Sequence, residues 1–191
     1  MFKTVINAFK IKEIRNKLIY TIIMLIIVRI GCQIPLPGTD SAVVAEVLGG
    51  LSAGGFGFFN ALTGSSFSSM SIFALNITVY ITASIIIQLL TIAFPKLEEM
   101  QKEGEDGRQK LAKITRYLTV GLALIESTAM SIGFGNRGIY GSISGGLYVW
   151  TIICSILVLT AGAVLIMWMG EQITEHGVGN GISIILLINI V

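Results

Sequence analysis

The chain has 191 residues, of which 53% are hydrophobic and 13% charged, and its mean hydropathy is +0.83. An ordinary soluble domain is about 25% charged, so this composition is typical of a membrane protein. The net charge of +2 provides no basic field, which argues against a nucleic-acid binder as well as against a soluble enzyme or a disordered tail.

Stretches without charge predict where helices cross a lipid bilayer. No Lys, Arg, Asp or Glu occurs at residues 47–95, 138–170 or 177–191. About 20 apolar residues in a helix cross the hydrocarbon core, so we expect spans near residues 18–34, 71–93, 117–134 and 147–169. A fifth apolar run, 182–191, has ten residues and is too short to cross, so we expect the chain to be cut inside that helix.

The first apolar run has two interpretations. Lys-rich residues precede Leu18, as they would in a signal peptide. However, the run is long, has no cleavage site with the small-x-small pattern, and is followed by further spans. An uncleaved first span is therefore favoured.

The basic residues predict the orientation of these spans. The amino-terminal tail and the loop after the second span contain most of the cations, and cytoplasmic loops carry an excess of Lys and Arg. We therefore expect both segments, and the amino terminus, on the cytoplasmic side. The residues are Lys3, Lys10, Lys12, Arg15 and Lys17 in the tail, and Lys96, Lys102, Arg108, Lys110, Lys113 and Arg116 in the loop.

The segment from 37 to 71 is apolar but is interrupted by many glycines and serines. Glycine costs about 1 kcal/mol per helical position relative to alanine, and unpaired backbone in lipid costs several, so this segment must be shielded by protein or line an aqueous cavity. A short aromatic patch inside it favours a small re-entrant helix, and an outer surface loop is the alternative. The apolar residues of the patch are Phe56, Phe58, Phe59, Leu62 and Phe67.

The predicted second span is polar for a helix that faces lipid. Intramembrane amides and hydroxyls either join neighbouring helices or line a water-filled path, and both interpretations remain open. Ile77 and Ile81 are four residues apart and share a helix face, as do Ile182 and Leu186 in the fifth run. Such pairs, taken alone, indicate core packing. The polar residues are Asn76, Thr78, Thr82, Ser84, Gln88 and Thr91.

Few residues of the sequence are candidates for a catalytic, proton-transfer or metal-binding site. Glu126 is the one carboxylate in the middle of a predicted span, where a neutral or hydrogen-bonded side chain facing the bundle is favoured over a proton relay. Cys32 and Cys154 lie far apart in apolar surroundings and predict free thiols, and His176 is the only histidine. Nothing in the sequence assembles a nucleophile, a base and an oxyanion site.

Several sequence strings are specific enough to indicate a protein family. Residues 71–91 read SIFALNITVYITASIIIQLLT, which closely resembles the second membrane helix of the SecY family of bacterial translocon channels. The strings KEGEDGR at 102–108, with TRY at 115–117, and GEQITEHGVGNGIS at 170–183 resemble the family's second-to-third loop and fourth-to-fifth turn. The string IPLPG at 34–38 is similar to the exit from its first helix.

The resemblance implies an all-α integral membrane protein: a bundle of four full spans and a truncated fifth, forming one half of a pseudo-symmetric ten-span channel. It implies that Ile77, Ile81, Ile182 and Leu186 supply part of an apolar pore ring, although isoleucine is common where Leu186 stands. It also implies a plug at about residues 55–69 and a lateral gate that includes Thr82 and, further along, Gln88. Within the plug, Phe59 and Asn60 are at matching positions.

The expected function is a passive conduit that moves secretory proteins across the bacterial plasma membrane and membrane proteins into it, without catalytic residues or cofactors. The expected partners are SecE and SecG subunits, the SecA motor, the ribosome, signal sequences, unfolded preproteins and membrane lipid. The family's main loops for SecA and the ribosome belong to its other half. Two alternatives remain: a half-length scaffold that binds partner helices without conducting, and a small-solute transporter that uses Glu126.

Overall fold

The computed structural model describes residues 11–40, 42–44, 46–47, 57, 60–61, 63–141 and 145–190. Between these limits the chain is helical, and the only β-pairing among the described residues is an isolated antiparallel bridge between Pro35 and Ser71. The expected all-α class is confirmed for this part of the chain. The helices are α2 (Lys12–Gln33), α5 (Thr78–Ala93), α6 (Pro95–Lys102), α7 (Glu105–Gly135), α8 (Gly146–His176) and α9 (Gly181–Ile190).

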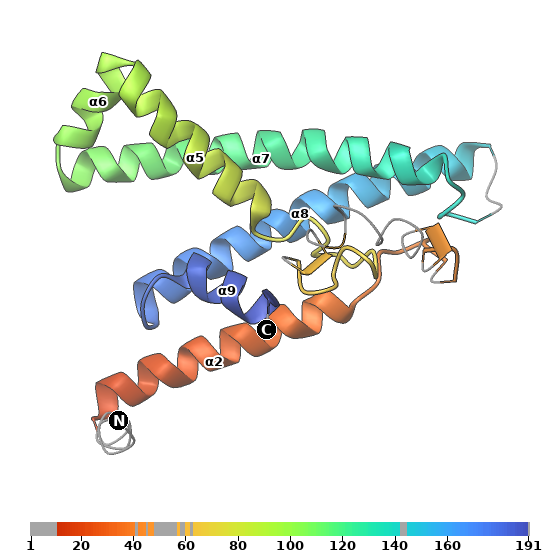
Figure 1. Ribbon diagram of the computed structural model, residues 1–191, viewed down its shortest axis with the longest axis horizontal. Coiled ribbons are helices and arrows are strands. Elements are labelled where there is room, and N and C mark those ends of the chain that lie inside the picture. The colour runs from red at the N-terminus through yellow and green to blue at the C-terminus, as the bar shows by residue number, and fades with distance from the viewer. Residues whose placement is uncertain are drawn as a thin grey trace.

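Among the described helices, α7 and α8 are each long and apolar enough to cross a membrane. Helices α5 and α6 would form a third crossing segment together, although they are bent by 105° where they meet. Pro95 causes this bend, because it disfavours helical backbone in the preceding residue, and Phe94 is extended at φ −116° and ψ 113°. Figure 1 shows α7 and α8 side by side, with α9 lying between α8 and α2.

The helix of the predicted second span begins at Thr78, and the expected start at Ser71 was wrong. The preceding residues pair with the exit from α2 instead: the amide of Ile72 donates to the carbonyl of Ile34 at 3.0 Å. Asn76 then adopts a left-handed backbone at φ 49°, which a right-handed helix cannot contain. Pairing with the exit from α2 therefore moves the start of α5 from Ser71 to Thr78.

Helix α7 packs against α8 through a stripe of small residues. The buried residues of α7 recur every four positions, which places them on one face: Thr115, Thr119, Ala123, Ser127 and Ser131. The hydroxyls of Ser127 and Thr160 lie 2.9 Å apart and form a hydrogen bond between the two helices. Small residues let helix backbones approach closely in a membrane, where apolar side chains gain little by leaving lipid.

Two buried clusters form the core. The first lies between the segment before α5 and helices α7 and α8, and includes Leu36, Met70, Tyr140 and Leu159. The second joins α2, α8, α9 and the start of α5: Val28, Cys32, Phe73, Ile77, Ile166, Met169, Ile173 and Ile185. Cys154 is half-buried, and it and Cys32 are free thiols.

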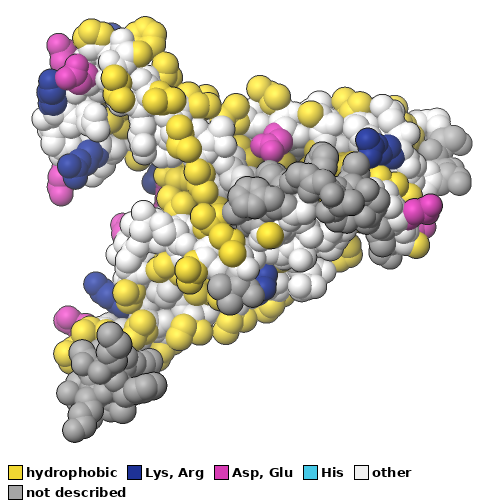
Figure 2. All heavy atoms as spheres, viewed as in Figure 1, with side chains coloured by type: hydrophobic (Ala, Val, Ile, Leu, Met, Phe, Trp, Pro, Cys, Tyr) yellow, Lys and Arg dark blue, Asp and Glu magenta, His cyan; other side chains and the backbone are white. Residues whose placement is uncertain are grey.

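Apolar side chains also cover much of the surface. Along α2, five isoleucines are 46–58% exposed: Ile22, Ile23, Ile26, Ile27 and Ile30. Figure 2 shows hydrophobic side chains spread over the visible face, while charged side chains gather around α6 and the adjoining start of α7. A surface of this kind fits lipid or further protein around the helices.

Candidate functional site

The four aliphatic residues predicted for the pore ring come together in the structure. Ile77 immediately precedes α5 and is 1% exposed, as part of the second cluster. Ile81 of α5 and Ile182 and Leu186 of α9 are half-buried and pack against the same cluster. Residues separated by about a hundred positions in the sequence thus form one aliphatic group.

A cavity of about 280 Å³ lies between α5 and α9. Ile81, Ile182 and Leu186 line it, together with Tyr80, Ser84, Ile85, Gln88, Asn180 and Ser183. Ile77 does not line this cavity. Its Cδ1 atom lies 3.4 Å from the position that a Cβ atom on Gly170 would occupy, so Ile77 packs inward against α8.

The turn between α8 and α9 positions the two residues of α9. The Thr174 hydroxyl accepts a hydrogen bond from the Gly181 amide at 2.9 Å, and the Asn180 side chain caps the helix by accepting from the Ile182 amide at 3.1 Å. Gly181 itself approaches the carbonyl of Gly170 so closely that a Cβ atom would overlap it. The start of α9 is therefore held directly against α8.

The same turn is tied to α2. The hydroxyl of Thr21 accepts a hydrogen bond from the Val178 amide at 3.2 Å, and the rings of Tyr20 and His176 are 6.1 Å apart. Helices α2, α8 and α9 thereby form one unit around the second cluster.

The two residues predicted for the lateral gate lie on different faces of α5. Gln88 is exposed at the cavity between α5 and α9, and its side-chain nitrogen donates to the Ser84 hydroxyl at 3.4 Å. Thr82 is also exposed but does not line the cavity, and its hydroxyl donates to the Thr78 carbonyl of the same helix at 3.0 Å. Thr82 shares its face with three exposed apolar residues, Ile85, Leu89 and Ile92.

The structure describes part of the predicted plug. Phe67 is buried in the first cluster, with its ring edge-on to that of Phe134 at 5.9 Å. The Asn60 side chain accepts a hydrogen bond from the Ser68 amide at 3.0 Å, which closes the segment into a compact turn. The remaining predicted plug residues, Phe56, Phe58, Phe59 and Leu62, lie outside the described residues.

Sequence reasoning missed a polar group at the base of this segment. Asn76 and Asn189 are 1% and 3% exposed, and the Asn189 side-chain amide donates to the Asn76 side-chain oxygen at 3.1 Å. Asn76 also donates to the carbonyl of Thr63 at 3.2 Å. A signal was present, because Asn189 is the only amide side chain in the run from 182 to 191, where Ser183 is the one other polar residue.

Glu126 lies half-buried on α7. No hydrogen bond or ion pair joins its carboxylate to another of the described residues. Among the residues that the structure describes, Glu126 thus has no bonded titratable partner that would complete a proton relay.

The family model described as SecY matches residues 71–191. The chain is 50% identical over 195 residues to "Protein translocase subunit SecY" of Bacillus subtilis, and 47% identical over 193 residues to the protein of the same name in Halalkalibacterium halodurans. These alignments cover 100% of this chain but 44% and 43% of the two relatives. A Staphylococcus aureus protein of that name is 43% identical over 191 residues, again 100% of this chain and 44% of the relative.

Proposed function

This chain belongs to the SecY family, and we propose that it forms the amino-terminal half of a channel that conducts secretory proteins across the plasma membrane and inserts membrane proteins into it. The chain spans less than half the length of the curated relatives it matches. A complete pore therefore needs the remaining part of such a protein. The proposed activity is passive conduction, to which no residue of this chain contributes catalysis and for which no cofactor is needed.

The aliphatic group on α5 and α9 carries this proposal. Ile81, Ile182 and Leu186 face one cavity, with Ile77 packed directly behind them. A ring of aliphatic side chains at a constriction dewets and impedes ions, yet it yields around a polypeptide because it makes no directional bonds. This chain would supply one half of the ring and the remaining part of the full-length protein the other half, and together they would close the pore.

Ion conductance of the resting full-length channel, reconstituted with its partner subunits in planar bilayers, tests the ring. Ile81→Ser should raise the conductance, because a hydroxyl wets the constriction. Ile125→Ser is the control: it makes the same substitution on α7, where Ile125 is 69% exposed and does not line the cavity. Equal conductance of the two variants would contradict the assignment of Ile81.

We further propose that the segment at about 55–69 is the plug. Two observations support a movable element: residues 63–69 form turns held by local hydrogen bonds, and Phe67 is the one large side chain among them that is buried. Elements that must leave and return are drawn from the low-stability parts of a structure. Deletion of residues 60–67 should therefore produce openings of the resting channel.

Thr82 and Gln88 are proposed to belong to the lateral gate. On the face of α5 that carries Thr82, the exposed Leu89 and Ile92 lie outside the cavity, while Ile85 lines it. This face is apolar enough to meet lipid or a signal sequence. Gln88 lies at the cavity, where it would meet a polypeptide in the pore. A seam between the two faces would connect the pore with lipid.

The orientation of the chain is proposed from the placement of its charged ends. The start of α2, helix α6 and the α8–α9 turn lie at one end of the molecule (Figure 1), and the cations of the first two lie there too. The positive-inside rule assigns this end to the cytoplasm of a bacterial cell, and with it the amino terminus.

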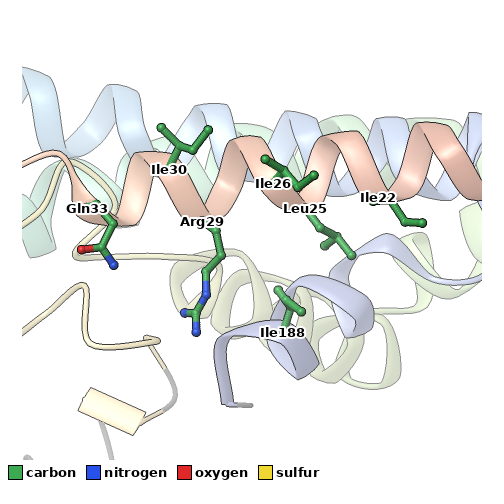
Figure 3. Close-up of a pocket in the computed structure, with 7 residues that line it drawn as sticks. All are labelled: Ile22, Leu25, Ile26, Arg29, Ile30, Gln33 and Ile188. Carbon is green, nitrogen blue, oxygen red and sulfur yellow. The ribbon is translucent and has the colours of Figure 1, made fainter.

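A groove on the surface of α2 suggests where one partner helix binds. A groove of about 550 Å³ between α2 and α9 is lined by five aliphatic residues and, in addition, by Arg29 and Gln33 (Figure 3). We propose that an apolar helix such as that of SecE docks along its aliphatic part. The aliphatic residues are Ile22, Leu25, Ile26, Ile30 and Ile188. We propose SecG, the SecA motor and the ribosome as further partners of the whole channel and assign them no residue of this chain. Signal sequences and unfolded preproteins would pass through the cavity and the gate.

A further inference from the structure

A polar junction lies where the plug segment meets α2 and α9. It consists of Arg29 on α2, Thr63 and Gly64 in the plug segment, Asn76 before α5, and Asn189 on α9. Thr63, Asn76 and Asn189 are buried. Unpaired polar groups are costly at membrane depth, so each member of such a group depends on the others.

Asn76 is the centre of this junction. Its side-chain nitrogen donates to the carbonyl of Thr63 at 3.2 Å, and its side-chain oxygen accepts from the Ile77 amide at 2.7 Å and from the Asn189 side chain at 3.1 Å. One side chain therefore bonds to the plug segment, to the start of α5 and to α9.

Gly64 allows the plug segment to approach the other two helices. Its backbone is left-handed at φ 62°, and a Cβ atom on it would lie 2.7 Å from Nη1 of Arg29 and 3.1 Å from the main-chain oxygen of Asn189. The same Cβ atom would lie 3.2 Å from the side-chain oxygen of Asn189. The guanidinium, the two oxygens and the plug backbone thus surround one point that only glycine leaves open.

Arg29 supplies positive charge to this point. Figure 3 shows its side chain extending from α2 toward the last turn of α9, at the polar end of the groove that Gln33 also lines. The side-chain oxygen of Asn189 is buried and has no hydrogen-bond partner among the described residues. A cation beside such an acceptor offsets part of the cost of burying it.

We propose that Arg29 and Asn189 are positioning residues that hold the plug segment in its closed place, by way of Gly64 and Asn76. The inference rests on the proposed function of this segment as a plug. When the segment leaves, Asn76 loses its hydrogen bond to the carbonyl of Thr63, and the Arg29 guanidinium loses its close contact with Gly64. The junction therefore stabilises the closed state relative to the open one.

The test uses the full-length channel, reconstituted with its partner subunits in planar bilayers, and measures the open probability at rest. Arg29→Met, Asn189→Leu and Gly64→Ala should each raise this probability by about tenfold, the size of effect that follows from losing one buried polar interaction. The double variant Arg29→Met/Asn189→Leu should open about as often as the more open single variant, because both changes disrupt one junction.

Matched variants separate the junction from general damage. Gly141→Ala is the control for Gly64→Ala: its backbone is also left-handed, at φ 68°, but its Cβ position has no contact within 4 Å from the described residues beyond its chain neighbours. It should keep the wild-type open probability. Arg29→Lys, which keeps the charge, should open less often than Arg29→Met. If Arg29→Met fails to accumulate in the membrane, the open probability of Gly64→Ala tests the junction instead, because this variant adds a single methyl group.

Deletion of residues 60–67 separates the junction proposal from the plug assignment on which it rests. If the deletion opens the channel but Gly64→Ala and Arg29→Met behave like Gly141→Ala, the junction proposal is overturned and the plug remains. If the deletion also leaves the open probability unchanged, the plug assignment itself fails, and the junction proposal fails with it.

Discussion

The side chain of Asn189 donates a hydrogen bond of 3.1 Å to the side chain of Asn76, across the buried contact between α9 and the start of α5. The two helices joined by this bond also supply the aliphatic residues of the proposed pore ring. This buried polar contact thus links α9 to the residues that lead into α5. Thermal unfolding of the full-length protein in detergent measures how much contacts of this kind stabilise it.

Asn76 has two separable roles, as a hydrogen-bonding group and as a residue that tolerates a left-handed backbone. Asn76→Gly removes the side-chain bonds to Thr63, Ile77 and Asn189 but suits the φ of 49°. Asn76→Ala removes the same bonds and adds backbone strain of roughly 1 kcal/mol. We expect the thermal unfolding midpoint to fall in the order wild type, Asn76→Gly, Asn76→Ala. If the two variants unfold at the same temperature, the backbone at position 76 is not strained by alanine.

Gly162 marks the closest approach of α8 to the segment before α5. A Cβ atom at this position would overlap the main-chain oxygen of Ile72, which cannot move aside as a flexible side chain could. Gly162→Ala should therefore destabilise the protein by roughly 1–3 kcal/mol, as overpacking does elsewhere. Gly133→Ala is the control, because Gly133 is helical and has open space around its Cβ position. It should stabilise the protein slightly, since alanine is the better helix former by about 0.5–1 kcal/mol.

The ion pair of Arg116 and Glu171 joins α7 to α8 at 2.7 Å, and the carboxylate side chain is only 19% exposed. The helical pair of Lys102 and Glu98 is 2.6 Å long, but its side chains are 72% and 50% exposed. We expect Arg116→Gln to lower stability by at most about 1 kcal/mol, with a smaller effect at high salt, and Lys102→Gln to be nearly neutral. Thermal unfolding at two salt concentrations measures both variants. A larger loss for Lys102→Gln would contradict this ranking.

Glu126 separates the channel from the alternative of a solute transporter. Glu126→Gln should leave preprotein secretion by cells close to the wild-type level, because the carboxylate has no polar partner among the described residues and is absent from the cavity between α5 and α9. A proton-coupled transporter would instead lose its activity. A strong secretion defect with normal protein levels would show that the carboxylate matters to conduction.

The apolar runs of the sequence predicted the position of most helices, because a charge in the hydrocarbon core is so costly that spans must be nearly free of charge. Helices α7 and α8 contain the predicted runs 117–134 and 147–169 and extend beyond them into charged residues. Helix periodicity also predicted that Ile182 and Leu186 share a face, and both line the cavity, whereas Ile77 precedes α5 and does not line the cavity with Ile81. Family resemblance, and not periodicity, identified these pairs as parts of one ring.

Other features depended on contacts between distant segments. The start of α5 at Thr78 and the bond between Asn76 and Asn189 could not be read from local patterns. Apolar burial is a property of single residues and of their spacing, and it is therefore visible in a sequence. The partner of a buried polar group is decided by which segments fold against it, and only the tertiary structure brought α9, the plug segment and α2 together at Gly64.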